Sequence, residues 1–441
     1  MLTVREIAFQ SLLKCEKNHS YPNIEIDSMI EKHNFSSNDR AFYTVLVYGT
    51  IEKKITLDYI ISQLSSRDIE KIDKEILVIL RMGVYQIMFM GGVPDHAACN
   101  ESVQLCAKNN KKSASGFVNA LLRELLRKKD VIKYPDKKKT PVKYLSVMYS
   151  YPEWLCEMWQ NDYGFDKCES VLSSLNNSPD MTLRVNTEKT SVAKVLEYLS
   201  EKEIKAEKGL YAKNAVRLTQ SYPVSQLDVL KNGEVFVQDE ASQLCAEVLD
   251  AKCGQTVIDT CSCPGGKSFS VALNMQNQGR VYSFDLHANK LSLIEKGAKK
   301  LGIDIIKTKA HDGSSYLEEL KGCADRVLVD APCSGLGVIA KKPDLRYKEK
   351  SAIERLPDIQ YRILNSSAEY VKSGGVLVYS TCTLNIRENE NVVQRFLEEH
   401  KDFEPFDFDL GDKIKSQNGM LTLYPDVHST DGFFISRFIR K

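Results

Sequence analysis

The sequence predicts a multidomain protein with an all-α helical bundle, a small α+β domain and a C-terminal α/β domain on a mostly parallel sheet. Three observations carry this prediction. The 441 residues exceed the usual size of one domain. Apolar residues recur at helical spacing through the N-terminal third. In the last two hundred residues, short apolar runs alternate with helical stretches, which indicates β-α-β units.

The first predicted domain spans residues 1–140. Apolar side chains lie three and four residues apart in several segments, among them 4–17, 37–64, 73–90 and 116–129. The last of these ends in a basic turn, which is favourable at a helix C-terminus. Lysines and prolines between residues 131 and 150 indicate a linker.

The second predicted domain spans residues 150–235. A helix is expected from Pro152, which suits a helix start. The alternating segment 181–187 predicts a strand, a helix follows over 191–204, and 215–220 predicts another strand. This pattern is typical of a small α+β domain and does not by itself indicate a function.

The third predicted domain spans residues 236–441. Its expected strands cover 256–260, 280–285, 305–312, 326–332 and 374–381, and 434–440 predicts an added antiparallel strand. Such sheets bind ligands at the carboxyl ends of their parallel strands. Functional side chains are therefore expected just after each of these segments.

Composition excludes several classes of protein. Hydrophobic residues make up 43% of the chain, too many for a disordered protein. The N-terminus lacks the pattern of a signal peptide, and no stretch approaches the roughly 20 apolar residues of a membrane span. The twelve cysteines are sparse and irregularly spaced, so we expect reduced thiols, a cytoplasmic protein and no membrane partner. Cys261 and Cys263 form the only close pair, without a nearby histidine, so no metal is expected.

Basic residues concentrate between positions 108 and 143, with twelve Lys or Arg against three acidic residues. A segregated basic stretch is a candidate surface for nucleic-acid phosphates. A solvated helix end followed by a charged linker is the competing interpretation.

Acidic side chains follow three successive predicted strands. The first strand ends at Asp259 and leads into a turn with two adjacent glycines, which allow close approach of backbone to ligand. Asp285 ends the second strand, where a carboxylate accepts hydrogen bonds from ribose hydroxyls. Asp312 ends the third. The glycine spacing differs from a dinucleotide fingerprint, which argues against a nicotinamide-dependent enzyme and favours S-adenosylmethionine as the cofactor.

Two cysteines follow the next two predicted strands. Asp330 and Cys333 come after the fourth strand, and Cys382 comes after the fifth. Carbon 5 of cytosine becomes nucleophilic when a thiolate adds to carbon 6, and an acid hydrogen-bonded to ring N3 favours that addition. The carbon 5 proton must then leave so that the thiol is expelled. Asp330, Cys382 and Cys333 fit the acid, the nucleophile and the group that assists elimination.

The segments 259–268, 329–346, 379–393 and 431–438 resemble the RNA cytosine-5 methyltransferase family, also called NOL1/NOP2/Sun. The resemblance implies a Rossmann-like catalytic domain that uses S-adenosylmethionine. It assigns Cys382 as the nucleophile, Cys333 to release, and Asp330 to both the catalytic and the cofactor site. Asp285 and Asp312 correspond to the family's ribose and adenine acids. The cofactor loop corresponds to Cys261, Ser262, Cys263, Pro264, Gly265, Gly266 and Lys267. The family usually has alanines where Ser262 and Cys263 stand here.

The N-terminal region is similar to the NusB fold of the bacterial antitermination factor, through residues 39–58, 79–90 and 116–124. The middle segment then resembles the small RRM-like domain that precedes the catalytic domain in this family. The combination resembles bacterial members that methylate 16S ribosomal RNA at a cytosine of the position-967 type, and we expect a monomer. Methylation of another rRNA or tRNA cytosine and a non-catalytic antitermination factor are the alternatives.

Overall fold

The computed structural model describes residues 2–18, 22–177, 179–220, 222–411 and 413–441. The chain divides into two compact units. The first consists of Met1–Asn176 with Ile339–Lys348, and the second of Asn177–Val338 with Glu349–Lys441. We describe each unit by itself.

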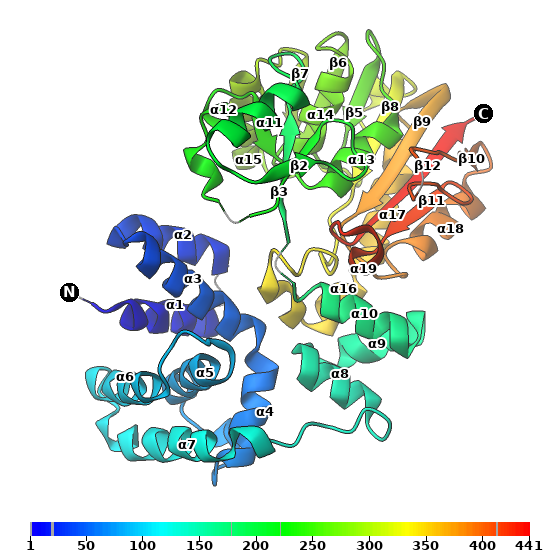
Figure 1. Ribbon diagram of the computed structural model, residues 1–441. Coiled ribbons are helices and arrows are strands. Elements are labelled where there is room, and N and C mark those ends of the chain that lie inside the picture. The colour runs from blue at the N-terminus through cyan, green and yellow to red at the C-terminus, as the bar shows by residue number, and fades with distance from the viewer. Residues whose placement is uncertain (1, 19–21, 178, 221, 412) are drawn as a thin grey trace. The chain divides into compact units, whose positions relative to one another are not determined.

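The first unit is helical, as the apolar spacing predicts (Figure 1). Its α-helices are α1 Val4–Asn18, α2 Pro22–His33, α3 Ser37–Glu52, α4 Lys54–Leu64, α5 Lys74–Phe89, α6 Asp95–Lys108, α7 Ser115–Lys128, α8 Pro141–Tyr149, α9 Glu153–Tyr163 and α10 Phe165–Ser174. Helix α5 is the most buried, with Ile79, Leu80 and Met82 inaccessible to solvent. Asp73 caps α5 by accepting a hydrogen bond from the Glu75 backbone N–H. The helical bundle is therefore organised around α5.

The predicted linker at 131–150 is only partly irregular, because α8 occupies its second half. Pro141 stands at the start of this helix, where its missing N–H costs nothing. Leu145 and Val147 bury the apolar side of α8. The lysines and prolines before the helix led to the prediction of a linker. Composition alone does not show which residues of a segment are buried.

The short helix Pro343–Tyr347 belongs to the first unit, although it follows the Cys333 turn in sequence. The guanidinium of Arg346 is fully buried and donates to the carbonyl of Glu52 at 3.0 Å. The Tyr347 hydroxyl donates to the carbonyl of Ile51 at 2.8 Å. These bonds satisfy carbonyl groups at the C-terminus of α3, which lack partners within their own helix.

The second unit contains a small antiparallel sheet in the order β2-β3-β1-β4. Its elements are β1 Met181–Val185, α11 Val192–Glu201, β2 Ala206–Lys208, β3 Ala215–Leu218, α12 Asp228–Lys231 and β4 Val235–Val237. Val195 and Leu199 of α11 pack in one apolar cluster with Leu183 and Val216 of the sheet. This arrangement confirms the predicted α+β character of the middle segment.

The larger sheet of the second unit has the order β10-β12-β9-β8-β5-β6-β7, with β11 paired to β12. Its strands are β5 Thr256–Asp259, β6 Arg280–Asp285, β7 Ile306–Ala310, β8 Ala324–Asp330, β9 Val371–Thr381, β10 Phe403–Pro405, β11 Met420–Leu423 and β12 Phe433–Arg440. The pairs formed by β5 to β9 are parallel. Strand β12 pairs antiparallel with β9, so the five predicted strands and the added C-terminal strand are confirmed.

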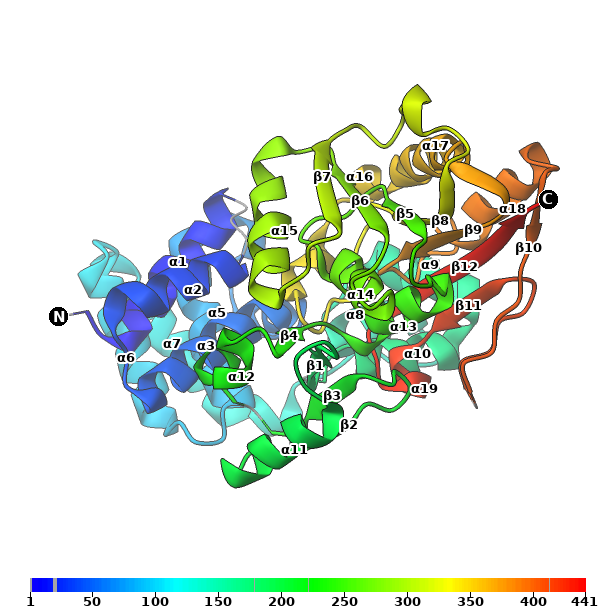
Figure 2. The same ribbon diagram turned by 90° about the horizontal axis from the view of Figure 1, so that it is seen from above.

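Helices cover both faces of the larger sheet (Figure 2). They are α13 Glu240–Leu249, α14 Gly266–Asn274 and α15 Ala288–Leu301 on one face, and α17 Leu356–Ala368 and α18 Glu390–Glu399 on the other. Successive residues of β8 point to opposite faces of the sheet. Leu328 packs in the apolar core formed with α13, α14 and α15, whereas Val327 and Val329 pack in the core formed with α17 and α18. A parallel sheet buried on both faces presents functional groups at the ends of its strands.

Candidate active site

The turn after β5 lies over the carboxyl ends of β5 and β6. Ser262 donates through both its backbone N–H and its hydroxyl to the carbonyl of Phe284 in β6, at 2.8 Å each. Gly265 has φ +110°, and a Cβ at that position would lie 2.5 Å from the Phe269 ring. Glycine is therefore required here. The turn leads directly into α14 and presents backbone rather than side chains.

Asp259 stabilises this turn through a hydrogen bond to the start of α14. Its carboxyl group is 1% exposed and accepts a hydrogen bond from Ser268 at 2.6 Å, at the start of α14. Burial raises the pKa of Asp259 to about 7. Asp259 thus fixes the first turn of α14 in the core of the unit.

Asp285 lies beside the glycine turn, at the end of β6. One carboxylate oxygen accepts from the backbone N–H of His287 at 3.0 Å, and the other from that of Cys263 at 3.3 Å. Each oxygen retains a further lone pair, and the side chain is only half-buried. The carboxylate is therefore able to accept hydrogen bonds from ribose hydroxyls.

Asp312 lies in the turn that follows β7, next to the end of β6. Asp285 and Ala310 are partners across β6 and β7, and the His311 N–H donates to the Asp285 carbonyl at 3.0 Å. The Asp312 carboxylate accepts from the Ser314 N–H at 2.9 Å, and this bond lowers its pKa. Two carboxylates and the glycine turn thus share one edge of the sheet, which fits the adenosine part of S-adenosylmethionine.

Asp330 ends β8 with both carboxylate oxygens engaged. The Lys267 ammonium lies 2.6 Å from one oxygen, and the Ser380 hydroxyl donates to the other at 2.9 Å. Burial opposes the charge of Lys267, but the Asp330 carboxylate offsets this effect and raises the pKa of the ammonium. The resemblance places Lys267 in the cofactor loop, whereas its charged end contacts Asp330.

The two cysteines from the neighbouring strands β8 and β9 meet at this edge. The Sγ atoms of Cys333 and Cys382 are 3.3 Å apart, and both thiols remain partly exposed. A hydrogen bond from Cys333 lowers the pKa of Cys382 despite burial, and the charge of Lys267 acts in the same direction. The same bond, burial and the charge of Glu388 raise the pKa of Cys333. These directions favour the thiolate form at Cys382 over the thiolate form at Cys333.

A buried carboxylate that sequence reasoning missed joins the two cysteine turns. Glu388 is inaccessible to solvent, and its Oε2 accepts from the Ser334 N–H and from Gln360 Nε2, both at 2.8 Å. Its Oε1 accepts from Asn385 Nδ2 at 2.9 Å. Only donors face this side chain, an arrangement that suits a carboxylate. The segment 385–391, rich in Asn and Glu, was a possible signal, but it does not show which side chain points inward.

Backbone hydrogen bonds also connect the turn that carries Cys333 with the turn that carries Cys382. Gly337 donates through its N–H to the Cys382 carbonyl at 3.0 Å, and the Gly432 N–H donates to the Gly337 carbonyl at 2.9 Å. A Cβ on Gly337 would lie 1.9 Å from the Gly432 carbonyl oxygen. The turn that carries Cys333 therefore leaves no room for a side chain at this point.

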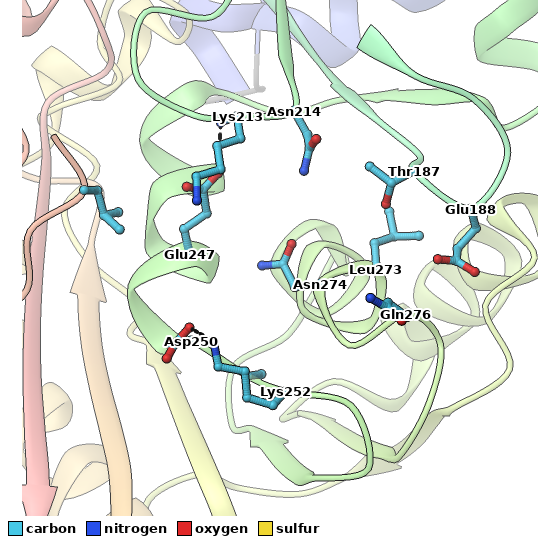
Figure 3. A pocket seen from close by; sticks show the side chains of 12 residues that line it. Thr187, Glu188, Lys213, Asn214, Glu247, Asp250, Lys252, Leu273, Asn274 and Gln276 are labelled. Atoms are coloured by element: carbon cyan, nitrogen blue, oxygen red, sulfur yellow. Dashed lines mark hydrogen bonds and ion pairs between the residues drawn. The ribbon is translucent and has the colours of Figure 1, made fainter.

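A separate cavity of about 480 Å³ lies between the small sheet and the catalytic domain, within the second unit. Figure 3 shows Asn214, Asn274 and Thr187 directed toward its interior, with Lys213 and Glu247 at one side. Asn274 ends α14, the helix that begins at the glycine turn. The cavity therefore lies at the far end of α14 and contains none of the predicted site residues.

Comparisons with known proteins match all three predicted regions. Residues 246–439 match a family described as 16S rRNA methyltransferase RsmB/F, residues 2–127 the NusB family, and residues 151–225 a ferredoxin-like domain of RsmF/B-like methyltransferases. A Bacillus subtilis protein named "Probable ribosomal RNA small subunit methyltransferase B" is 39% identical over 100% of this chain and 99% of its own. The chain belongs to the 16S rRNA methyltransferase RsmB/F family. It is an S-adenosylmethionine-dependent methyltransferase.

Further relatives agree with this family over most of the chain. The Proteus mirabilis protein named ribosomal RNA small subunit methyltransferase B is 31% identical over 92% of each chain. The solved structure titled "Crystal Structure of PH0851" covers 100% of this chain and 99% of its own, with 25% identity and a TM-score of 0.83. The domain limits at residues 140, 150 and 235 stay predictions.

The described residues contain no group of three or more His, Cys, Asp or Glu side chains that would hold a metal ion. Helices long and apolar enough to cross a bilayer are also missing from the described part of the chain.

Proposed function

We propose that this RsmB/F-family methyltransferase methylates carbon 5 of a cytosine in 16S rRNA, of the position-967 type, through a covalent bond between Cys382 and carbon 6. The observation that supports this proposal most directly is the pair of thiols 3.3 Å apart beside the Asp330 carboxylate. We place the reaction in the cytoplasm.

The first step is addition of the Cys382 thiolate to carbon 6. Its sulfur electron pair forms the new bond, and the ring electrons shift so that N3 takes a proton from solvent. The Asp330 carboxyl group, which contacts Lys267 and Ser380, accepts a hydrogen bond from protonated N3. This contact favours the form of the ring whose carbon 5 is nucleophilic.

S-adenosylmethionine, when bound, would supply the methyl group to carbon 5 and would leave as S-adenosylhomocysteine. We assign its binding to the turn Cys261–Lys267, with Asp285 at the ribose and Asp312 near the adenine. The open space beside Gly266 supports this assignment, because a Cβ there would meet no atom closer than 3.5 Å. A cofactor is thus able to approach the backbone of the turn.

Release of the product requires loss of the proton from carbon 5. Once Cys382 is bonded to carbon 6, its hydrogen bond and charge no longer raise the pKa of Cys333, and Cys333 gives its proton to solvent. The Cys333 thiolate then accepts the carbon 5 proton, the C–H electrons restore the double bond between carbons 5 and 6, the bond to Cys382 breaks, and N3 returns its proton to solvent. Cys333 is suited to this role because its sulfur lies beside the sulfur that leaves. Cys382 is regenerated as a thiolate for the next turnover.

The test separates the two cysteines. Cys382→Ala removes the nucleophile, so neither methylated RNA nor a covalent adduct should form. Cys333→Ala permits attack and methyl transfer but should stall release, which leaves protein cross-linked to RNA on a denaturing gel. Cys253→Ala is the matched control, because this exposed thiol lies outside the site described above.

The contrast between the variants decides the outcome. Two packing cysteines would give two similar, mildly destabilised proteins. An adduct with the Cys382 variant and none with the Cys333 variant would reverse the roles. Full activity in both variants would overturn the thiol mechanism.

A further inference from the structure

The basic stretch 108–143 separates into two parts in the structure. In its first part, four lysines are paired with acidic side chains of other helices, of neighbouring loops or of the same helix. The pairs are Lys108 with Glu6 at 3.0 Å, Lys111 with Asp73 at 2.9 Å, Lys128 with Glu124 at 2.9 Å and Lys129 with Asp95 at 3.7 Å. These four lysines are locally neutralised, so each of them attracts a polyanion only weakly.

The second part, residues 132–143, comprises the connection from α7 to α8 and the first turn of α8, and we call it the lysine loop. Among the described residues, Lys133, Lys138, Lys139 and Lys143 have no acidic partner, and all four are exposed. Lys137 differs, because its ammonium lies 2.6 Å from Glu169 and 4.9 Å from the centre of the Phe165 ring. Four unpaired positive charges therefore lie within eleven residues.

Asp136, the acidic residue of the loop, forms no ion pair with these four lysines in the described part of the chain. The Asp136 carboxylate accepts hydrogen bonds from the backbone N–H groups of Lys138 at 2.9 Å and Lys139 at 2.8 Å. These bonds close a tight turn, and the Thr140 N–H donates to the Asp136 carbonyl at 2.9 Å. The lysine side chains project from a backbone that is already ordered, which reduces the entropy lost on binding.

An aromatic side chain accompanies the charges. Tyr134 is 39% exposed and stacks on Tyr59 of α4, with ring centroids 6.4 Å apart. Unpaired bases of RNA stack on such exposed rings, whereas an acidic protein surface gains little from them. The combination of point charges and an exposed ring favours RNA over an acidic protein as the partner.

We propose that the lysine loop binds the phosphate backbone of the substrate RNA, while the paired lysines of α6, α7 and the connection between them do not. The inference rests on the proposed function, in which this chain acts on RNA. It assigns the electrostatic contact to the connection between α7 and α8 and the first turn of α8.

Two quadruple variants of the full chain test the inference, each removing four positive charges. The first replaces Lys133, Lys138, Lys139 and Lys143 with Gln, and the second replaces Lys108, Lys111, Lys128 and Lys129 with Gln. Affinity for an unmodified 16S rRNA transcript is measured over a series of KCl concentrations. Each lost phosphate contact lowers the log–log salt slope by about 0.7–0.9, so the loop variant should lose about 3 in slope. The paired-lysine variant should lose less than about 1.

Equal slopes for the loop variant and the wild type would overturn the inference, as would a larger loss in the paired-lysine variant. Unchanged affinity of both variants for S-adenosylhomocysteine verifies that the second unit is intact. Methylation of the same RNA by the wild type reports on the proposed function separately. An active wild type whose loop variant keeps the full salt slope would therefore refute the RNA contact alone.

Discussion

Glu388→Gln tests whether the buried carboxylate between the cysteine turns controls the chemistry. The two side chains have the same shape, so no cavity is created. A glutamine amide offers one oxygen and one NH2 group where the carboxylate offers two oxygens. When the amide oxygen faces Ser334 and Gln360, the NH2 group faces Asn385 Nδ2, donor against donor.

The cost follows from the number of contacts. One hydrogen bond to a charged group is lost and two become neutral, and each charged bond contributes about 1.5–3 kcal/mol. We expect the variant to lose about 2–4 kcal/mol of unfolding free energy. More important for function, the backbone N–H of Ser334, next to Cys333, is held less firmly. The distance between the two sulfurs then varies.

Single-turnover reactions distinguish positioning from mere stability. A structural role would lower the melting temperature and the active fraction, and it would leave the ratio of adduct to released product unchanged. A positioning role should shift that ratio toward adduct, as a milder form of Cys333→Ala. Glu398→Gln is the matched control, because this acid lies exposed on α18 and accepts a hydrogen bond from Gln394 of the same helix. A destabilised Glu388 variant with the wild-type ratio would refute the reasoning.

Two further predictions concern the cofactor and the nucleophile. Asp285→Ala should weaken S-adenosylmethionine binding by about 1.5–3 kcal/mol, because the ribose hydroxyls lose a charged hydrogen-bond acceptor. Calorimetry measures this affinity, and an unchanged value would show that Asp285 does not bind the cofactor. Lys267→Met should raise the pKa of Cys382, because the Lys267 charge lowers it. The thiolate fraction rises with pH, so the ascending limb of the pH profile for adduct formation should move to higher pH. A shift to lower pH would contradict the assigned electrostatics.

The sheet was predictable because its strands are short apolar runs bounded by turns and helices. Segment 280–285 coincides with β6, and the C-terminal run forms the antiparallel strand β12. Helix α8 was missed because its sequence begins with proline and lysine, and its helical character depends on burial of Leu145. Burial depends on which other segments pack against a residue, and local sequence does not specify that.

The site was predictable in its residue types and less so in its contacts. Cys333, Cys382 and Asp330 were expected together because they follow neighbouring strands, and the structure brings them together. The contact between Lys267 and Asp330 was not expected, since it joins the start of α14 to the end of β8. Side-chain direction in a turn depends on its exact dihedral angles, which a motif does not specify.

The distance between the two thiols depends on strand register. Asp330 of β8 is the partner of Ser380 in β9, and each cysteine follows within three residues. Between the pairs Ala324–Val371 and Arg326–Val376, β9 accommodates extra residues in an irregular segment that includes Gly374, whose φ is +73°. Because successive side chains alternate between faces, a shift of one residue would direct the Ser380 hydroxyl away from Asp330. The glycine-containing irregularity at the start of β9 therefore contributes to the alignment at its other end, where Ser380 meets Asp330 and Cys382 meets Cys333.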